Sequence, residues 1–220
     1  MTVIEFNFND DWMGEISRRL GDLNDKTPDV ISQATNSTAR KARKLIVQSL
    51  RGHYAEDAKT KEYNAAMKIA RASRKKYDAT IYIRGKVQNL RRFNVSPKDP
   101  PASGSRRPPT TRAQVLLQGG LKELNKGGIK AFITTFKNGD VVVAQRNGSF
   151  YTYHRPTGGI DRHHEAIDKL WSISIPKMAE SQLDPKTVRG NMRDTIQAIL
   201  VEEIEKQIAR QLAKHGGNTG

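Results

Sequence analysis

The chain has 220 residues, of which 36% are hydrophobic and 28% are charged, and its formal net charge is +15 at pH 7. The hydrophobic share is below the usual level of about 45%, so we expect a modest core and extensive polar or interface surface. The lack of cysteine excludes disulfides, thiol nucleophiles, cysteine-bound zinc and iron–sulfur clusters. No apolar run approaches the roughly 20 residues that span a bilayer, so we expect no membrane partner.

The positive charge is concentrated in one third of the chain. Residues 1–39 contain 3 basic and 7 acidic side chains, residues 40–112 contain 20 and 5, and residues 113–220 contain 15 and 11. A local excess of this kind attracts polyanions, most often nucleic acid, and also suits an acidic protein surface. The alternative is a solvated basic face that only confers solubility.

The first elements are expected to be a short strand and then helices. Alternating apolar residues open the N-terminal segment, 1–26, and Trp12, Ile16 and Leu20 then recur every four residues as on a helix face. Thr27-Pro28 combines a capping threonine with proline at the first helical position, so a long helix is predicted to start there and to end near Gly52.

Two further elements and an extended arm are expected before residue 112. The pattern predicts a polar helix at about 56–72 and, from β-branched and aromatic residues, a strand at 79–83. The sequence from Ser96 to Thr111 contains five prolines, which exclude both a helix and a central strand. We therefore predict an extended basic, proline-rich arm at 94–112, which reaches toward a partner.

A hairpin is the clearest prediction for the middle of the chain. Residues 129–136 and 141–146 flank Asn138-Gly139, the strongest short turn signal. Between the glycine pairs at 119–120 and 127–128 we expect a short helix-like piece, and residues 150–153 are expected to add an edge strand.

The C-terminal part is expected to contain a strand at 170–175 and a long helix that begins at Asp184-Pro185. The predicted fold class is α+β, an antiparallel β-sheet flanked by N-terminal and long C-terminal helices. We expect a single domain over 27–215, which includes the arm, and a flexible tail at 216–220.

Evidence for catalysis is lacking in the sequence. There is no nucleophile-elbow, zinc-protease or phosphate-loop motif. His163, His164 and Glu165 are the one tempting metal set, but adjacent histidines on a helix diverge by about 100°, and a polar helix start before Ile167 is the simpler interpretation. We therefore expect no enzyme, no cofactor and no metal; a nuclease that uses these three residues is a weaker alternative.

The basic residues of the middle third are the candidate contact residues. Lysine and arginine give attraction to phosphates that depends on salt but not on sequence. We predict that some of the following side chains face DNA or an acidic partner: Arg74, Lys75, Lys76, Arg84, Arg91, Arg92, Arg106, Arg107 and Arg112.

Four segments in order carry a family resemblance. They are a helix leading into a basic stretch (31–51), Leu90-Arg91-Arg92-Phe93 before a proline-rich segment, residues 129–133 running into Asn138-Gly139, and a strand that ends in residues 173–178 ahead of a long helix. Together they span about 28–212. In this order the chain resembles the minor tail protein Z family of tailed bacteriophages, called tail completion proteins in some phages.

The resemblance implies a non-enzymatic virion protein, made in the host cytoplasm, at the head–tail junction or upper tail. It implies a subunit of a homo-oligomeric ring that helps to join the tail to the head and to accommodate the genome end. The implied partners are the tail terminator, the tail tube, the head–tail connector and genomic DNA in the channel. The rival hypothesis, from the charge alone, is a free DNA-binding protein without sequence specificity.

Overall fold

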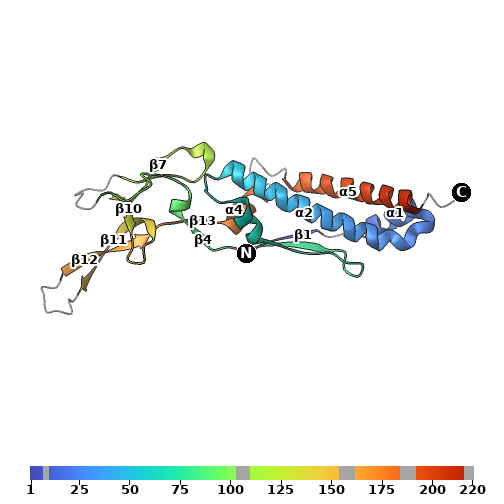
Figure 1. Ribbon diagram of the computed structural model, residues 1–220, viewed down its shortest axis with the longest axis horizontal. Helices are drawn as coiled ribbons and strands as arrows, with labels where there is room; N and C mark the ends of the chain where they lie inside the picture. Colours follow the sequence, from blue (N-terminus) through green and yellow to red (C-terminus); the bar gives the residue numbers. More distant parts are fainter. Residues whose placement is uncertain (7–9, 103–109, 154–161, 184–191, 216–220) are drawn as a thin grey trace. The chain divides into compact units, whose positions relative to one another are not determined.

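The computed structural model describes residues 1–6, 10–102, 110–153, 162–183 and 192–215 (Figure 1). The chain divides into two compact units. The helical unit consists of Met1–Leu50, Lys59–Lys86 and Ile175–Gly220, and the strand unit consists of Arg51–Ala58 and Val87–Ser174. The single domain expected over 27–215 stays a prediction.

The α+β class is confirmed. The strand pairings of the described residues are all antiparallel, a long helix lies near the N-terminus, and another helix closes the described chain. The helical unit contains β1 (Thr2–Phe6), α1 (Asp10–Leu20), η1 (Gly21–Lys26), α2 (Thr27–His53, whose last three residues count with the strand unit), α3 (Thr60–Ala66), β2 (Met67–Ala70), β3 (Ala79–Ile83), α4 (Ile175–Leu183) and α5 (Met192–His215).

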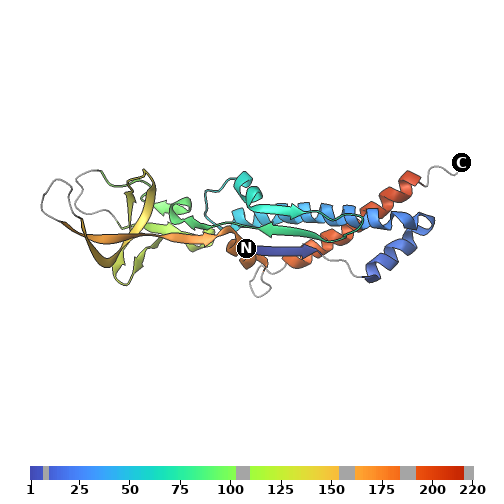
Figure 2. The ribbon, with the colours of Figure 1, turned by 90° about the horizontal axis from the view of Figure 1, so that it is seen from below.

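A three-stranded sheet, in the order β1-β3-β2, forms one layer of the helical unit. Ala79, Ile81 and Ile83 alternate along β3 and are fully buried, because successive side chains of a strand point to opposite faces and these three point to one. Figure 2 shows the strands in front of α2 and α5, so the helices cover this apolar face. The opposite face carries the more polar residues of each strand.

The helices meet in a core that α1, α2 and α5 share. Ile16, Ile31 and Ile204, one from each helix, are buried in the same cluster. Beside it the ammonium group of Lys41 lies 2.7 Å from a carboxylate oxygen of Glu203. Burial alone would raise the pKa of Glu203, but the hydrogen bond and charge of Lys41 outweigh it and lower that pKa. The α2–α5 contact is thus partly electrostatic.

The strand unit is built from short antiparallel pairings. Its sheets have the orders β10-β11-β12, β13-β4, β5-β6-β7 and β8-β9. The elements are β4 (Val87–Asn89), η2 (Leu90–Arg92), β5 (Asn94–Ser96), β6 (Arg112–Gln114), η3 (Leu117–Gly119), β7 (Lys122–Glu123), β8 (Asn125–Lys126), β9 (Ile129–Lys130), β10 (Phe132–Thr135), β11 (Val141–Tyr153), β12 (Arg162–Lys169) and β13 (Trp171–Ser174).

The hairpin predicted around Asn138-Gly139 is present, with Thr135 opposite Val141 and Gly139 at a φ of 84°. The long-helix start at Thr27 and the strand at 79–83 also agree with the structure. The capping role predicted for Thr27 is wrong, because Thr27 has helical dihedral angles and its buried hydroxyl makes no hydrogen bond. Residues 150–153 do not form a separate strand, because β11 continues past a bulge at 146–150 and pairs with β12.

Three predicted elements are wrong in part or whole. The helix expected at 56–72 is present only as Thr60–Ala66, since Met67–Ala70 pairs with β3 and this pairing overrides helix propensity. The piece between the glycine pairs is not helical and forms β7 and β8. The expected helix start before Ile167 is strand β12, because β11 offers it a partner.

Several predictions fall on residues outside the described part of the chain. They are the centre of the proline-rich arm (103–109), the start of the last helix at 184–191 and the tail at 216–220. At either end of the arm, β5 and β6 pair with each other, with Ser96 opposite Arg112. Within the described residues, no helix combines the length and apolarity that crossing a membrane requires.

The shared core predicts a large effect of shortening one side chain on α5. Ile204 is 1% exposed, so Ile204→Ala should lower the free energy of unfolding by about 2–5 kcal/mol through lost burial and a cavity. Leu212→Ala on the same helix is the control, because Leu212 is 41% exposed and should cost less than about 1 kcal/mol. Urea unfolding followed by circular dichroism measures both; equal losses would contradict this core.

Candidate interaction surface

The nine basic residues predicted to contact a partner do not form one cluster in a single unit. Of the seven in the described part of the chain, four belong to the helical unit and three to the strand unit. The first group is Arg74, Lys75, Lys76 and Arg84, and the second is Arg91, Arg92 and Arg112. Arg106 and Arg107 lie outside the described residues.

Three of these residues occupy the turn between β2 and β3. The turn, residues 73–76 and here called the basic turn, is closed by backbone hydrogen bonds in both directions between Ser73 and Lys76, at 2.6 and 3.2 Å. The Ser73 hydroxyl also accepts a bond of 3.2 Å from the Lys76 amide. The chain is therefore held tightly at the point where Arg74, Lys75 and Lys76 follow one another.

Helix α2 holds the chain just before this turn. The side-chain amide of Asn36 donates to the carbonyl of Ala72 at 3.0 Å and accepts from its N–H at 2.9 Å. A side-chain amide thus satisfies both backbone groups of one residue, as a neighbouring strand would. This pair of bonds anchors the hairpin to the middle of α2.

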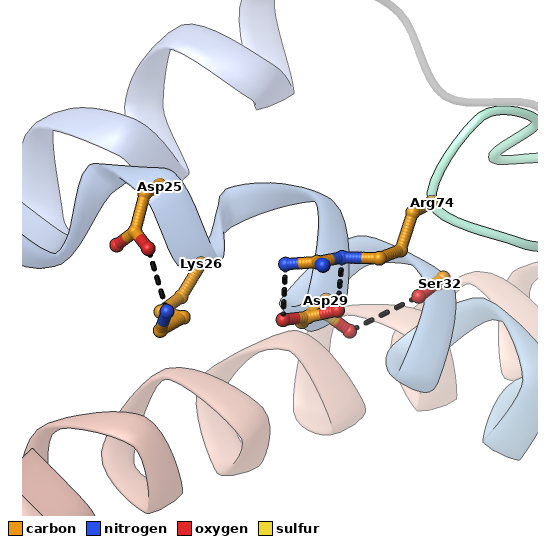
Figure 3. Close-up of polar contacts among 5 residues, drawn as sticks. All are labelled: Asp25, Lys26, Asp29, Ser32 and Arg74. Carbon is orange, nitrogen blue, oxygen red and sulfur yellow. Dashed lines mark hydrogen bonds and ion pairs between the residues drawn. The ribbon is translucent and has the colours of Figure 1, made fainter.

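A second anchor joins the turn to the first turn of α2 (Figure 3). The Arg74 guanidinium contacts both carboxylate oxygens of Asp29, with its Nε at 2.8 Å and its Nη2 at 2.9 Å. The Ser32 hydroxyl donates to the backbone carbonyl of Asp29 at 3.2 Å, within the same helical turn. A two-pronged Arg–carboxylate contact fixes direction as well as distance.

The anchors divide the three cations of the turn into two roles. Arg74 forms an ion pair with Asp29. Lys75 and Lys76 are exposed and have no acidic partner among the described residues. Arg71, also exposed, adds a cation just before the turn and was not among the predicted contact residues. Arg84, at the other end of β3, lies 6.0 Å from the centre of the Tyr82 ring.

In the strand unit, Arg92 has an internal role. Its Nε lies 3.3 Å from a carboxylate oxygen of Glu56, whose side chain is 0% exposed. The backbone carbonyl of Arg92 also accepts a hydrogen bond of 2.7 Å from the amide of Asp57. Because a buried carboxylate needs a nearby cation, this arginine supports the fold.

Arg91 and Arg112 are more exposed than Arg92. The Nη2 of Arg91 lies 3.8 Å from a carboxylate oxygen of Asp99, whose side chain is 84% exposed. The Nε of Arg91 donates to the backbone carbonyl of Lys98 at 3.4 Å. Arg112 lies on the central strand β6, between Ser96 and Glu123 in register. These two residues remain candidates for contact with a partner.

The three residues weighed as a metal set lie on β12. On a strand His163 and Glu165 share one face and His164 points to the other, so the three do not converge. Glu165 contacts Arg146 at 3.2 Å, and the His164 ring stacks on Tyr151 with a centroid distance of 5.7 Å. In the described ranges, no group of three or more potential ligands is placed to hold a metal ion.

Most of the chain matches the model of a known protein family. The family model described as prophage minor tail protein Z (GPZ) matches residues 15–215. No curated protein and no solved structure matches the chain. The match covers both units and includes every basic residue discussed above.

Loss of the Asn36 anchor should loosen the basic turn. Asn36→Ala leaves the N–H and carbonyl of Ala72 without these bonds, so we expect a loss of about 1–3 kcal/mol in the free energy of unfolding and faster amide exchange at 73–78. Gln33→Ala, an exposed change on the same helix, should alter neither. Hydrogen exchange read by mass spectrometry tests this; unchanged exchange in Asn36→Ala would contradict the anchor.

The two neighbouring arginines of η2 should differ in their effect on stability. Arg92→Ala leaves buried Glu56 without its cation and should cost about 2 kcal/mol or more, whereas Arg91→Ala should cost about 0.5 kcal/mol or less. Adding Glu56→Gln to Arg92→Ala should recover part of the loss. Urea unfolding of the four proteins measures this, and equal costs for the two single changes would contradict the assignment.

Proposed function

The chain belongs to the prophage minor tail protein Z family, and from that premise we propose that it is a tail completion or neck subunit at the head–tail junction or upper tail. Family membership makes it a structural protein of the phage tail, located in the virion and in contact with other tail proteins. The proposal adds where the subunit sits and what it does there, which is to help join the tail to the head and accommodate the genome end.

The proposed assembly is a homo-oligomeric ring between the tail terminator, the tail tube and the head–tail connector. Two features of the chain support a role inside an assembly. Its hydrophobic content is low for its length, and large apolar side chains such as Val3, Val87 and Leu117 are exposed. Exposed apolar side chains of this size favour contact with other subunits.

The basic turn carries the proposal about the partner's charge. Lys75 and Lys76 are presented at the end of a hairpin that Asn36 and Arg74 anchor to α2. Two exposed lysines on an anchored turn suit a surface that an anion passes or docks on, because no base-reading element is needed to attract phosphates. The proposed anion is genomic DNA in the channel or an acidic neighbouring ring.

Charge reversal at the turn tests this proposal. Particles that carry Lys75→Glu and Lys76→Glu should show impaired head–tail joining or genome retention, with infectivity reduced about tenfold or more, because attraction to an anion becomes repulsion. Electron microscopy and plaque counts measure the two effects. These positions are preferable to Arg91 and Arg92, because reversal at Arg92 would also destabilise buried Glu56.

The matched control reverses two exposed lysines of the strand unit, Lys122 and Lys137, and should leave infectivity close to that of the wild type. Normal particles from the Lys75→Glu/Lys76→Glu variant would contradict the role of the turn. Mass spectrometry of purified virions tests the rest: a low, fixed copy number in the tail fraction is expected. Absence from particles, with DNA affinity that falls about 10³-fold or more between 50 and 200 mM salt, would favour the free DNA-binding protein instead.

A further inference from the structure

Both outer strands of the sheet in the helical unit have an open edge. In the order β1-β3-β2, β1 and β2 each pair with β3 on one side. Among the described residues, no backbone hydrogen bond joins the other side of Thr2–Phe6 or Met67–Ala70 to another element. Such rows of N–H and carbonyl groups are templates for pairing with a further strand.

The two edges carry opposite charges on the same face of the sheet. Val3 and Lys68 both lie in register with Tyr82, and Glu5 lies one step further along the same face, in register with Thr80. Lys68 and Glu5 are exposed, and neither has an ion pair among the described residues. β1 thus offers an anion and β2 a cation on the same face of the sheet, two residues apart in register.

A groove follows the open edge of β1. Its volume is about 900 Å³, and residues Met1 to Phe6 line one wall. Successive residues of β1, which belong to both faces of the sheet, line it, as a groove along the outer edge requires. The other wall includes Ile196, Leu200 and Val201 of α5, and Val201 is 38% exposed. An incoming strand would therefore find apolar side chains beside the open hydrogen-bonding groups.

We infer that β2 of one copy of the chain adds to the β1 edge of the next copy, so that one sheet continues from subunit to subunit. Since β1 and β2 both run antiparallel to β3, they run parallel to each other, and the joined pair is parallel. The register we infer for the joined strands is the one that pairs the two charges, with Lys68 of one copy beside Glu5 of the next. The inference rests on the proposed ring and names the surfaces that build it.

This contact is heterologous, because two different edges meet. Repetition of one such contact closes into a ring when the rotation between copies divides a full turn. Pairing of β1 with β1 would instead end at a two-fold dimer and place like charges near each other. The charges on the two edges thus favour the arrangement that a ring requires.

Cysteine cross-linking tests the contact, because the chain has no native cysteine. Glu5→Cys/Lys68→Cys should give a ladder of disulfide-linked multimers on mild oxidation, in the purified protein and in virions. Within one copy the two positions lie on strands separated by β3, roughly 10 Å or more apart. That exceeds the reach of a disulfide, so the bond must form between copies.

Mixing the two single variants should give a cross-linked dimer, whereas neither variant alone should. Glu15→Cys/Lys68→Cys is the matched control, with the acidic partner moved to an exposed position on α1, and it should give no ladder. As a second measurement, Glu5→Lys and Lys68→Glu should each weaken self-association roughly 3- to 10-fold, and the double exchange should restore it.

The remaining outcomes separate this inference from the proposed function. If native mass spectrometry shows oligomers or virions contain a fixed copy number, but no ladder forms, the strand contact is wrong and the ring stands. If Glu5→Cys alone forms dimers, the β1–β1 pairing replaces it. If the charged side chains serve only to keep the edges apart, removing either charge will increase association, and the inference fails. Absence of the chain from virions would refute the proposed function itself.

Discussion

The helical unit depends on the burial of α2 on more than one side. Twelve of its 27 residues are buried, among them the three consecutive residues Val30, Ile31 and Ser32. At about 100° per residue these three positions span about 200°, a sector wider than the roughly 100° stripe of a helix that packs on one side only. α2 therefore contacts the sheet with one part of its surface and α1 and α5 with another. Small residues on this sector, such as Ala34 and Ala42, allow close packing.

A helix buried in this way must satisfy its polar residues within the protein, and α2 uses them to hold other elements. Asn36 holds the β2–β3 hairpin, Asp29 holds Arg74, and Lys41 binds Glu203 of α5. Burial of Glu203 costs free energy unless its charge is paired, so Lys41 also fixes which face of α5 meets α2. The position of the basic turn thus follows from the same helix that organises the core.

Local signals in the sequence were sufficient to predict an element where its structure depends on the segment itself. Asn138-Gly139 located the β10–β11 turn, and Thr27-Pro28 marked the start of α2, although the Thr27 hydroxyl makes no capping hydrogen bond there. Prediction failed for segments whose structure depends on contact with residues far away in the sequence. Met67–Ala70 contains good helix formers but pairs with β3. Glu56 and Arg92, which form an ion pair, are 36 residues apart in the sequence. The Asn36–Ala72 and Asp29–Arg74 contacts also join residues that are far apart in the sequence, so no rule about residue spacing predicts them.

The same contacts reduce the part of the excess positive charge that is available to a partner. A net charge of +15 over 40–112 suggests a broad attractive surface, but Lys41, Arg74 and Arg92 each have an acidic partner that supports the fold. Exposed cations without such a partner among the described residues include Lys68, Arg71, Lys75 and Lys76, and all four lie on the β2–β3 hairpin. Cations fixed on one hairpin act on a partner at a defined place, whereas dispersed cations only raise solubility. The positive charge available to a partner is therefore smaller than the net charge of residues 40–112, and it is concentrated on one hairpin.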